Sequence, residues 1–331
     1  MPVSALPRPE FAPSLRTPGV RVTIHGADSP EGRELARLLR LHPGIESARE
    51  IACDGGLLVG WDATVEPHWR SPSGRYSAAD YVFVCLPPER AAPVVAAALE
   101  AGARVIDLSR DPSWSLGSPT EEAAYGLPEL TPGRVREADH VASAGSLASC
   151  ATLALGPVAM AGELDEDAEV QIEATVGLAR WPRRDPEEVR AEIEANLRAL
   201  HRGAGEPELR LEVKLEPSAR GVQVKARMPR THLDNARLQT LYATFYADAP
   251  CVDVVPEGEP VRPHLQETSK ALIAARAADD TVEIRCALGD ALKGAVGQAI
   301  QNMNVMCGFP QQLGLPEFGQ PLTPPPRLPA D

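Results

Sequence analysis

The sequence lacks the long apolar run that a membrane segment needs. A spanning helix takes about 18 or more consecutive apolar residues, and no such stretch occurs in the chain. Residues 1–19 are interrupted by prolines and charges, which does not fit the apolar core of a secretion signal. We therefore expect a soluble, cytoplasmic protein with no membrane partner.

Paired cysteines and a surplus of basic residues are lacking as well. The six cysteines form no Cys-x-x-Cys pair and have no histidine at metal-ligand spacing, so we expect neither disulfides nor a metal site. The net charge of −13 argues against a nucleic-acid partner, because phosphate backbones are bound by clustered Lys and Arg. Anionic small molecules remain compatible with it, since a few local donors suffice to bind them.

The first part of the chain alternates strand and helix patterns. A β-rich run at 20–24 ends at Gly26 and is followed by leucines at helical spacing in 31–41. Strand patterns at 81–86 and 104–108 then enclose an alanine-rich helix at 91–101. This order predicts an α/β fold that begins with a Rossmann-type parallel sheet.

The second half predicts a mixed α+β domain. Asp185 is expected to cap a helix that runs to about Leu200. The remaining predicted elements are strands at 169–176, 222–228 and 282–288 and a helix at 235–246. The predicted organisation is an extension at 1–19, a nucleotide domain at 20–145, a substrate and dimerisation domain at 146–295, and at 296–331 a helix returning to the nucleotide domain before a proline-rich tail.

The turn after the first strand has only part of a glycine-rich nucleotide loop. Gly26 and Gly32 are in place, but Ser29 occupies the middle position, where glycine lets the backbone approach a diphosphate. Asp28 and Glu31 add carboxylates beside the expected diphosphate, which weakens or abolishes binding. A strand-to-helix turn needs glycine and a cap residue in any case. Near the second strand, Asp54 either favours an unphosphorylated ribose or only shapes a turn.

Longer motifs carry a family resemblance. The stretches 125–130 (YGLPEL) and 291–304 (ALKGAVGQAIQNMN), with 80–87, 105–109, 220–222 and 245–248, stand in one order along the chain. In this the chain resembles the N-acetyl-gamma-glutamyl-phosphate reductase family of the semialdehyde dehydrogenase group. The resemblance implies NADP as cofactor, reduction of an acyl phosphate to a semialdehyde in arginine-type amino-acid biosynthesis, and a homo-oligomer.

The resemblance also implies which residues would bind the dinucleotide. It places Leu86, Pro87 and Asn302 beside the nicotinamide and Gly145 at the oxyanion site. The full set of implied cofactor-binding residues is Gly26, Ser29, Gly32, Leu86, Pro87, Gly145, Gly294, Gln298 and Asn302. The small residues of the last motif also fit a simpler role, in which they allow close helix packing.

The family's nucleophilic cysteine is missing. Ser146 stands at its position, and an alcohol ionises many pKa units above a thiol, so the family reaction is expected to be lost or redirected. Cys150 lies four residues on, and 146–152 also resembles the Ser-Asn-Ala-Ser-Cys-Thr-Thr motif of glyceraldehyde-phosphate dehydrogenases. Pro157 fits either register. The apolar neighbours of Cys150 favour a buried helix residue over a relocated nucleophile.

The family's catalytic base is missing too. If the segment 201–208 is aligned on Pro207-Glu208, the base histidine becomes Gly205. If it is aligned on His201-Arg202, His201 takes that role, although it also suits a helix end. By the same resemblance, a further histidine appears as Lys214, and an arginine that contacts substrate appears as Gln266.

Two classes of function follow. The first is an NADP-dependent reductase of an acyl phosphate, or a redirected relative that uses Ser146, Cys150 or His201. The second is a catalytically inactive paralogue that forms a hetero-oligomer with an active homologue. The local chemistry favours the second, and the resemblance along the chain supports the first.

Overall fold

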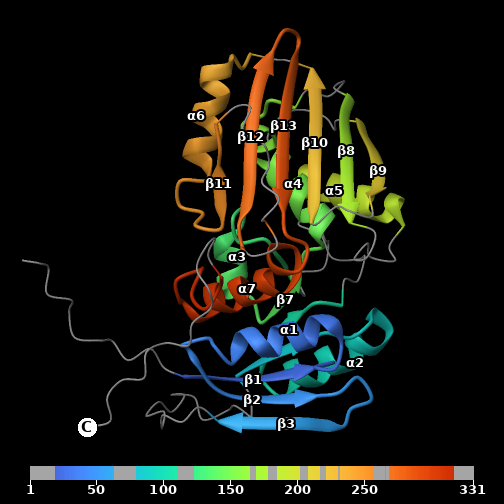
Figure 1. Ribbon diagram of the computed structural model, residues 1–331, viewed down its shortest axis with the longest axis vertical. Helices are drawn as coiled ribbons and strands as arrows, with labels where there is room; N and C mark the ends of the chain where they lie inside the picture. Colours follow the sequence, from blue (N-terminus) through green and yellow to red (C-terminus); the bar gives the residue numbers. More distant parts are fainter. Residues whose placement is uncertain are drawn as a thin grey trace, which may run out of the picture.

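The computed structural model describes residues 19–62, 80–109, 123–164, 169–177, 185–201, 208–216, 221–229, 232–256, 265 and 268–316. Two sheets lie at opposite ends of the molecule, with helices between them (Figure 1). The fold is α/β, as predicted.

The first sheet has seven strands in the order β3-β2-β1-β4-β5-β7-β6. Its strands pair in parallel except β2 with β3, so the edge strand β3 is an antiparallel addition to the predicted parallel sheet. The strands are β1 (Val20–His25), β2 (Ile45–Ile51), β3 (Leu57–Asp62), β4 (Tyr81–Val84), β5 (Arg104–Asp107), β6 (Ala124–Gly126) and β7 (His140–Ser143). Its crossover helices are α1 (Pro30–Leu39), α2 (Pro88–Glu100) and α3 (Pro132–Glu137).

The second sheet has six strands in the order β11-β12-β13-β10-β8-β9. Strand β10 alternates, with Val222, Val224, Ala226 and Met228 buried and the residues between them more exposed, so one face forms the core. The strands are β8 (Glu169–Gly177), β9 (Glu208–Glu216), β10 (Val222–Pro229), β11 (Val252–Val254), β12 (Ala271–Ala278) and β13 (Thr281–Leu288). The helices of this part are α4 (Ser146–Met160), α5 (Pro186–Leu200) and α6 (Asn235–Phe245).

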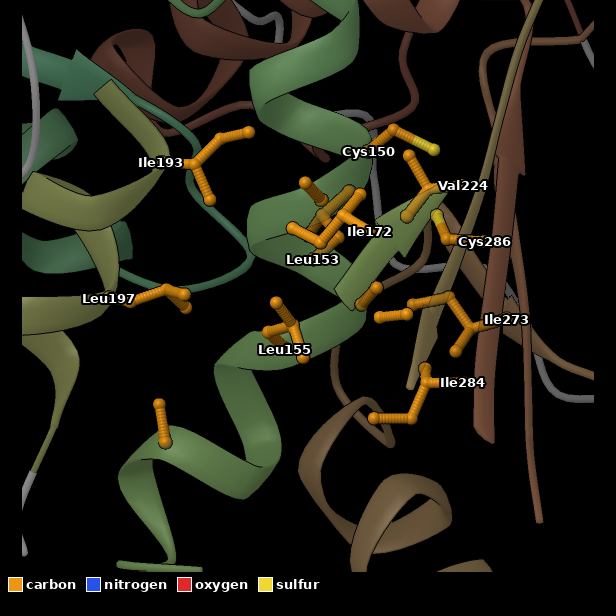
Figure 2. Packing of buried hydrophobic residues seen from close by; sticks show 14 of the residues in the cluster. Cys150, Leu153, Leu155, Ile172, Ile193, Leu197, Val224, Ile273, Ile284 and Cys286 are labelled. Carbon is orange, nitrogen blue, oxygen red and sulfur yellow. The ribbon is translucent and has the colours of Figure 1, made fainter. Parts of the chain in front are cut away.

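Helix α4 is the centre of the second core. Every residue from Leu147 to Ala159 is buried, which requires apolar neighbours all round the helix. Its side chains lie between α5 and the sheet: Leu153 and Leu155 are grouped with Ile172 and Val224 in the same cluster (Figure 2). The sheet and α5 therefore hold α4 rigidly, and its N-terminus points at the first sheet.

The chain returns to the first sheet at its end. A π-helical turn, η3 (Leu292–Val296), leads into α7 (Gly297–Cys307). Ile300 and Met303 of α7 belong to the same apolar cluster as Ile24 of β1. Arg104 of β5 holds the end of α7 by donating to the Met306 carbonyl at 2.7 Å. The first sheet, whose strands all come from the first half of the sequence, is thus covered by a helix from the second half.

Candidate functional site

The residues expected at a dinucleotide site gather at one edge of the first sheet. Gly26 follows β1, Leu86 follows β4, Gly126 ends β6 and Gly145 follows β7. The carboxyl ends of parallel strands share one edge, and β1 lies between β2 and β4, where the direction of winding reverses. This edge is therefore where a doubly wound sheet binds a nucleotide.

The glycine-rich turn leaves no room for side chains at two points. Gly26 has φ +78°, and a Cβ on it would lie 2.3 Å from the Cys85 carbonyl oxygen. A Cβ on Gly32 would lie 2.1 Å from the carbonyl oxygen of Gly26. The turn, the first turn of α1 and the end of β4 are therefore packed backbone to backbone, as a diphosphate cradle requires.

Ser29 is the N-terminal cap of helix α1. Its Oγ accepts a hydrogen bond of 2.9 Å from the Gly32 N–H, at the start of α1. Pro30, the next residue, has no N–H. At this helix end the Gly32 N–H is therefore already bonded, and residue 30 has no N–H to offer a diphosphate. The backbone nevertheless keeps the shape of the cradle.

Ser146 lies at the N-terminus of α4, in contact with η3. Gly145 is extended, with φ −70° and ψ 150°, and Ser146 is the first helical residue and partly exposed. A Cβ on Gly294 would lie 2.5 Å from the Ser146 Cβ, so only glycine fits there. The structure thus brings together Ser146, Gly145 and Gly294, with the positive end of the α4 dipole beside the hydroxyl.

Cys150 lies in a different environment from Ser146. Its side chain is fully buried, with Sγ 3.9 Å from the Val222 carbonyl oxygen. Figure 2 shows the sulfur lying toward the sheet, near Val224 and Cys286. Burial, followed by the contact with Cys286, raises the pKa of this thiol well above its usual value. A thiolate is therefore not available at this position.

His201 is not brought to Ser146. Its backbone N–H caps the end of α5, and Asn196 of that helix donates to Thr152 of α4 at 3.1 Å. A Cβ on Gly156 would lie 3.8 Å from Leu200, so the end of α5 packs beside Gly156. Gly156 lies ten residues after Ser146, about 15 Å along the helix at 1.5 Å per residue.

Asn302 and Gln298 of α7 present amide groups at the sheet edge. Asn302 Nδ2 donates to the Gly126 carbonyl at 3.2 Å, while its Oδ1 is buried without a partner. Gln298 Nε2 donates to Gln301 Oε1 at 3.2 Å, and its Oε1 has no partner either. Unpartnered buried acceptors are costly. Together with the glycine cradle, they fit a ligand with amide or hydroxyl donors, as a nicotinamide dinucleotide has.

One polar cluster near this site was not anticipated. Lys293 of η3 is fully buried and forms an ion pair with Glu129, and its Nζ also donates to Gln301 Oε1 at 2.7 Å. Gln301 Nε2 in turn donates to Glu129 Oε1 at 2.7 Å. The sequence held one signal for this cluster. The motif 291–304 contains a lysine among small apolar residues, and the distant motif 125–130 contains a glutamate.

Of the remaining expected positions, Lys214 lies on the second sheet, whereas Leu86 and Pro87 lie at this edge. Lys214 is exposed on β9, and Leu86 and Pro87 follow β4, with Leu86 buried against the glycine-rich turn. Gly205, Gln266 and Arg220 lie outside the described residues. In the part of the chain that is described, no helix is long and apolar enough to cross a membrane, and no group of three or more His, Cys, Asp or Glu side chains is arranged to hold a metal.

The architecture is shared with solved semialdehyde dehydrogenases. Aspartate semialdehyde dehydrogenase II from Vibrio cholerae, solved with ASA, aligns with a TM-score of 0.62 at 14% identity, over 87% of this chain and 98% of that one. The enzyme from Candida albicans, solved with NADP, aligns with a TM-score of 0.63 at 12% identity over the same shares. The family model for the NAD binding domain of semialdehyde dehydrogenase matches residues 21–138. The chain thus has the fold of the semialdehyde dehydrogenases.

Sequence comparison narrows the class. A protein of Thermomicrobium roseum named as a putative LysW-L-2-aminoadipate 6-phosphate reductase is 30% identical over 89% of this chain and 97% of its own length. The N-acetyl-gamma-glutamyl-phosphate reductases of Acidothermus cellulolyticus and Moorella thermoacetica are also 30% identical, over 91% and 89% of this chain and 99% and 98% of theirs. The chain belongs to the N-acetyl-gamma-glutamyl-phosphate reductase family.

Proposed function

We propose that this chain binds a nicotinamide dinucleotide but does not reduce acyl phosphates, and that it acts as a partner subunit of an active homologue. The observation that carries the proposal is the absence of a thiolate at the α4 N-terminus. Ser146 occupies that position, and the nearest cysteine along the helix, Cys150, has its thiol in the core. The related reductases suggest an acyl phosphate of an amino dicarboxylic acid as the substrate that an active partner would reduce.

The chemistry explains why serine is a poor substitute. Attack on an acyl phosphate needs a nucleophile that is ionised near neutral pH, and a thiol at a helix N-terminus meets that need. The Ser146 hydroxyl stays protonated, and the candidate base His201 lies at the far end of α4. What remains at this point is a helix end able to bind a negatively charged oxygen.

The proposed dinucleotide binding is supported by the glycine-rich turn, the end of β4 and two amides of α7. Gly26 and Gly32 would leave room for the diphosphate, Leu86 and Pro87 would cover the cofactor beside β4, and the amide oxygens of Gln298 and Asn302 would receive donors of the ligand. When bound, such a cofactor supplies a hydride donor. In this chain we propose that its main effect is to stabilise the fold that a partner recognises.

The outer face of the second sheet supports the partner role. Helices α4 and α5 pack against one face of this sheet (Figure 1). The other face bears ion pairs among the described residues. Arg227 bridges Glu173 at 2.9 Å and Glu283 at 3.1 Å. A sheet face that carries both positive and negative side chains can pair with the same face of a homologous chain. We therefore propose that this chain associates through this face with a homologue or with a second copy of itself.

Light scattering of the chain alone and mixed with an active reductase tests this association. Two species that do not mix would contradict the partner role.

The catalytic proposal is tested with wild type, Ser146→Ala and Ser146→Cys. Turnover of N-acetyl-gamma-glutamyl phosphate with NADH and with NADPH is expected to stay at background for wild type and Ser146→Ala alike. Iodoacetamide at neutral pH is expected to label Ser146→Cys rapidly and wild-type Cys150 only after unfolding, because the helix end ionises an exposed thiol. Turnover by wild type that Ser146→Ala abolishes would show that the serine is a working nucleophile.

A further inference from the structure

A carboxylate occupies the corner between the glycine-rich turn and the end of β2. The neighbouring strands β1 and β2 end together, with His25 beside Ile51 in the register. From the turn, the exposed Asp28 reaches across, and its Oδ1 accepts a hydrogen bond of 2.6 Å from the Cys53 N–H. Two residues that are 25 positions apart thus close this corner of the nucleotide site.

This corner is where a doubly wound fold meets the adenosine ribose. An acidic side chain at the end of the second strand accepts hydrogen bonds from the ribose hydroxyls of NAD, whereas a 2′-phosphate needs a cation and free N–H donors. The backbone N–H of Cys53 is used by Asp28, and that of Gly56 is used by Asp54 at 2.9 Å. Donors that a 2′-phosphate would need are therefore taken by carboxylates.

The charges around the corner balance. Arg33 donates to the Asp28 carbonyl, and Arg90, from the first turn of α2, acts electrostatically on Cys53. Among the described residues, these two cations offset the carboxylates of Asp28 and Asp54, which leaves no surplus of positive charge there for a phosphate dianion. Hydrogen bonds from the Cys53 thiol and N–H lower the pKa of Asp28, so its carboxylate stays charged.

We infer that Asp28 sets the cofactor preference of this chain toward NADH and against NADPH. The inference rests on the proposed dinucleotide binding and departs from the NADP that the family resemblance implies. The Asp28 carboxylate, held at the end of β2, accepts from a ribose hydroxyl and repels a 2′-phosphate, while the diphosphate cradle is the same for both cofactors.

Calorimetric titration of the full chain with NADH and NADPH tests the inference without any turnover. Wild type is expected to bind NADH at least tenfold more tightly than NADPH. Asp28→Asn keeps an oxygen for the Cys53 N–H and removes the charge. We expect it to reduce the ratio of NADH affinity to NADPH affinity at least threefold, mainly by strengthening NADPH binding. Asp28→Ser gives a second variant in case the first is poorly folded. Asp139→Asn, an exposed change before β7, controls for net charge and is expected to leave the ratio unchanged.

Equal or tighter binding of NADPH by wild type would overturn the inference while leaving the proposed dinucleotide binding in place. A ratio that Asp28→Asn and Asp28→Ser both leave unchanged, in variants with native circular dichroism, would overturn the role of Asp28. Failure of wild type to bind either cofactor would overturn both the inference and the dinucleotide part of the proposed function.

Discussion

Gly32 shows how one missing side chain shapes the nucleotide edge. A Cβ at this position would meet the Gly26 carbonyl oxygen at 2.1 Å, and backbone cannot move aside as a side chain can. Gly32→Ala is expected to cost about 1–3 kcal/mol and to remove dinucleotide binding. Gly133→Ala in α3 is the matched control, because nothing lies within 4 Å of its Cβ, and it is expected to gain up to about 1 kcal/mol. Urea unfolding and cofactor titration of both variants measure this; equal stabilities would contradict the steric argument.

His42 makes the fold sensitive to acid. Its ring is buried, Nδ1 accepts from the Gly44 N–H at 3.0 Å, and Nε2 donates to Asn304 Oδ1 at 3.0 Å. A proton on Nδ1 would break the first of these bonds. Burial lowers the pKa of His42, and this outweighs the opposing effect of the Asn304 hydrogen bond.

The sign of the effect follows from linkage. Below the ordinary histidine pKa of about 6.5, His42 binds a proton in the unfolded chain but stays neutral in the folded chain. The folded state therefore loses stability as the pH falls below that value, by at most about 1.4 kcal/mol per pH unit. We expect the free energy of unfolding to fall between pH 7.5 and 5.5, and His42→Gln to reduce that fall. The pKa of His25 is also lowered by burial, so part of the fall will remain. An identical pH dependence in His42→Gln would contradict this role.

Helix α4 contains a proline that a second element compensates. Pro157 has no N–H, so the Leu153 carbonyl loses its partner within the helix. The Tyr246 hydroxyl, at the end of α6, donates to that carbonyl at 2.6 Å. A buried carbonyl is thus satisfied by a residue 93 positions away in the sequence.

A double-mutant cycle tests this compensation. Tyr246→Phe is expected to cost about 1–3 kcal/mol, because it leaves a buried carbonyl without a donor. Tyr242→Phe is the matched control: its hydroxyl donates to the Ala154 carbonyl, which keeps a helical donor in Val158, so the cost should be smaller. In the background of Pro157→Ala the cost of Tyr246→Phe should also shrink. Equal costs for the two tyrosines would disprove the argument.

At the scale of the whole molecule, the Lys293 and Glu129 ion pair ties the end of the chain to the first domain. Glu129 follows β6, and Lys293 belongs to the π-helical turn that touches Ser146 through Gly294. Both side chains are fully buried. Such a pair contributes little compared with apolar packing, but removal of one partner leaves a buried charge.

Lys293→Met is therefore expected to cost about 3–5 kcal/mol, and the double variant Lys293→Met/Glu129→Gln to recover at least half of that loss. Lys225→Met is the matched control on the outer face, where the exposed pair with Glu173 is worth at most about 1 kcal/mol. Urea unfolding measures all three. A double variant no more stable than Lys293→Met would show that the cost lies in packing rather than in the charge left behind.

Much of the fold could be predicted from local pattern, while several strands could not. Helix α5 begins after Asp185 and ends at Leu200, as its cap residue and apolar spacing predicted. Strand β9 was not predicted, although its charged residues alternate with apolar ones in the pattern typical of a half-exposed strand. Strand β2 was presumed ahead of Asp54 without bounds, whereas β3, which pairs with β2 in antiparallel fashion, was not predicted.

The sequence by itself determined the alternation of strand and helix in the first half, the glycine positions, the serine at position 146 and the resemblance to the family, because these depend on residue type and on neighbours within a few positions. Only the tertiary structure decided which distant groups meet: Asp28 with Cys53, Ser146 with Gly294, and Lys293 with Glu129. Those meetings depend on strand order and burial, and burial sets whether a thiol ionises or a charge needs a partner.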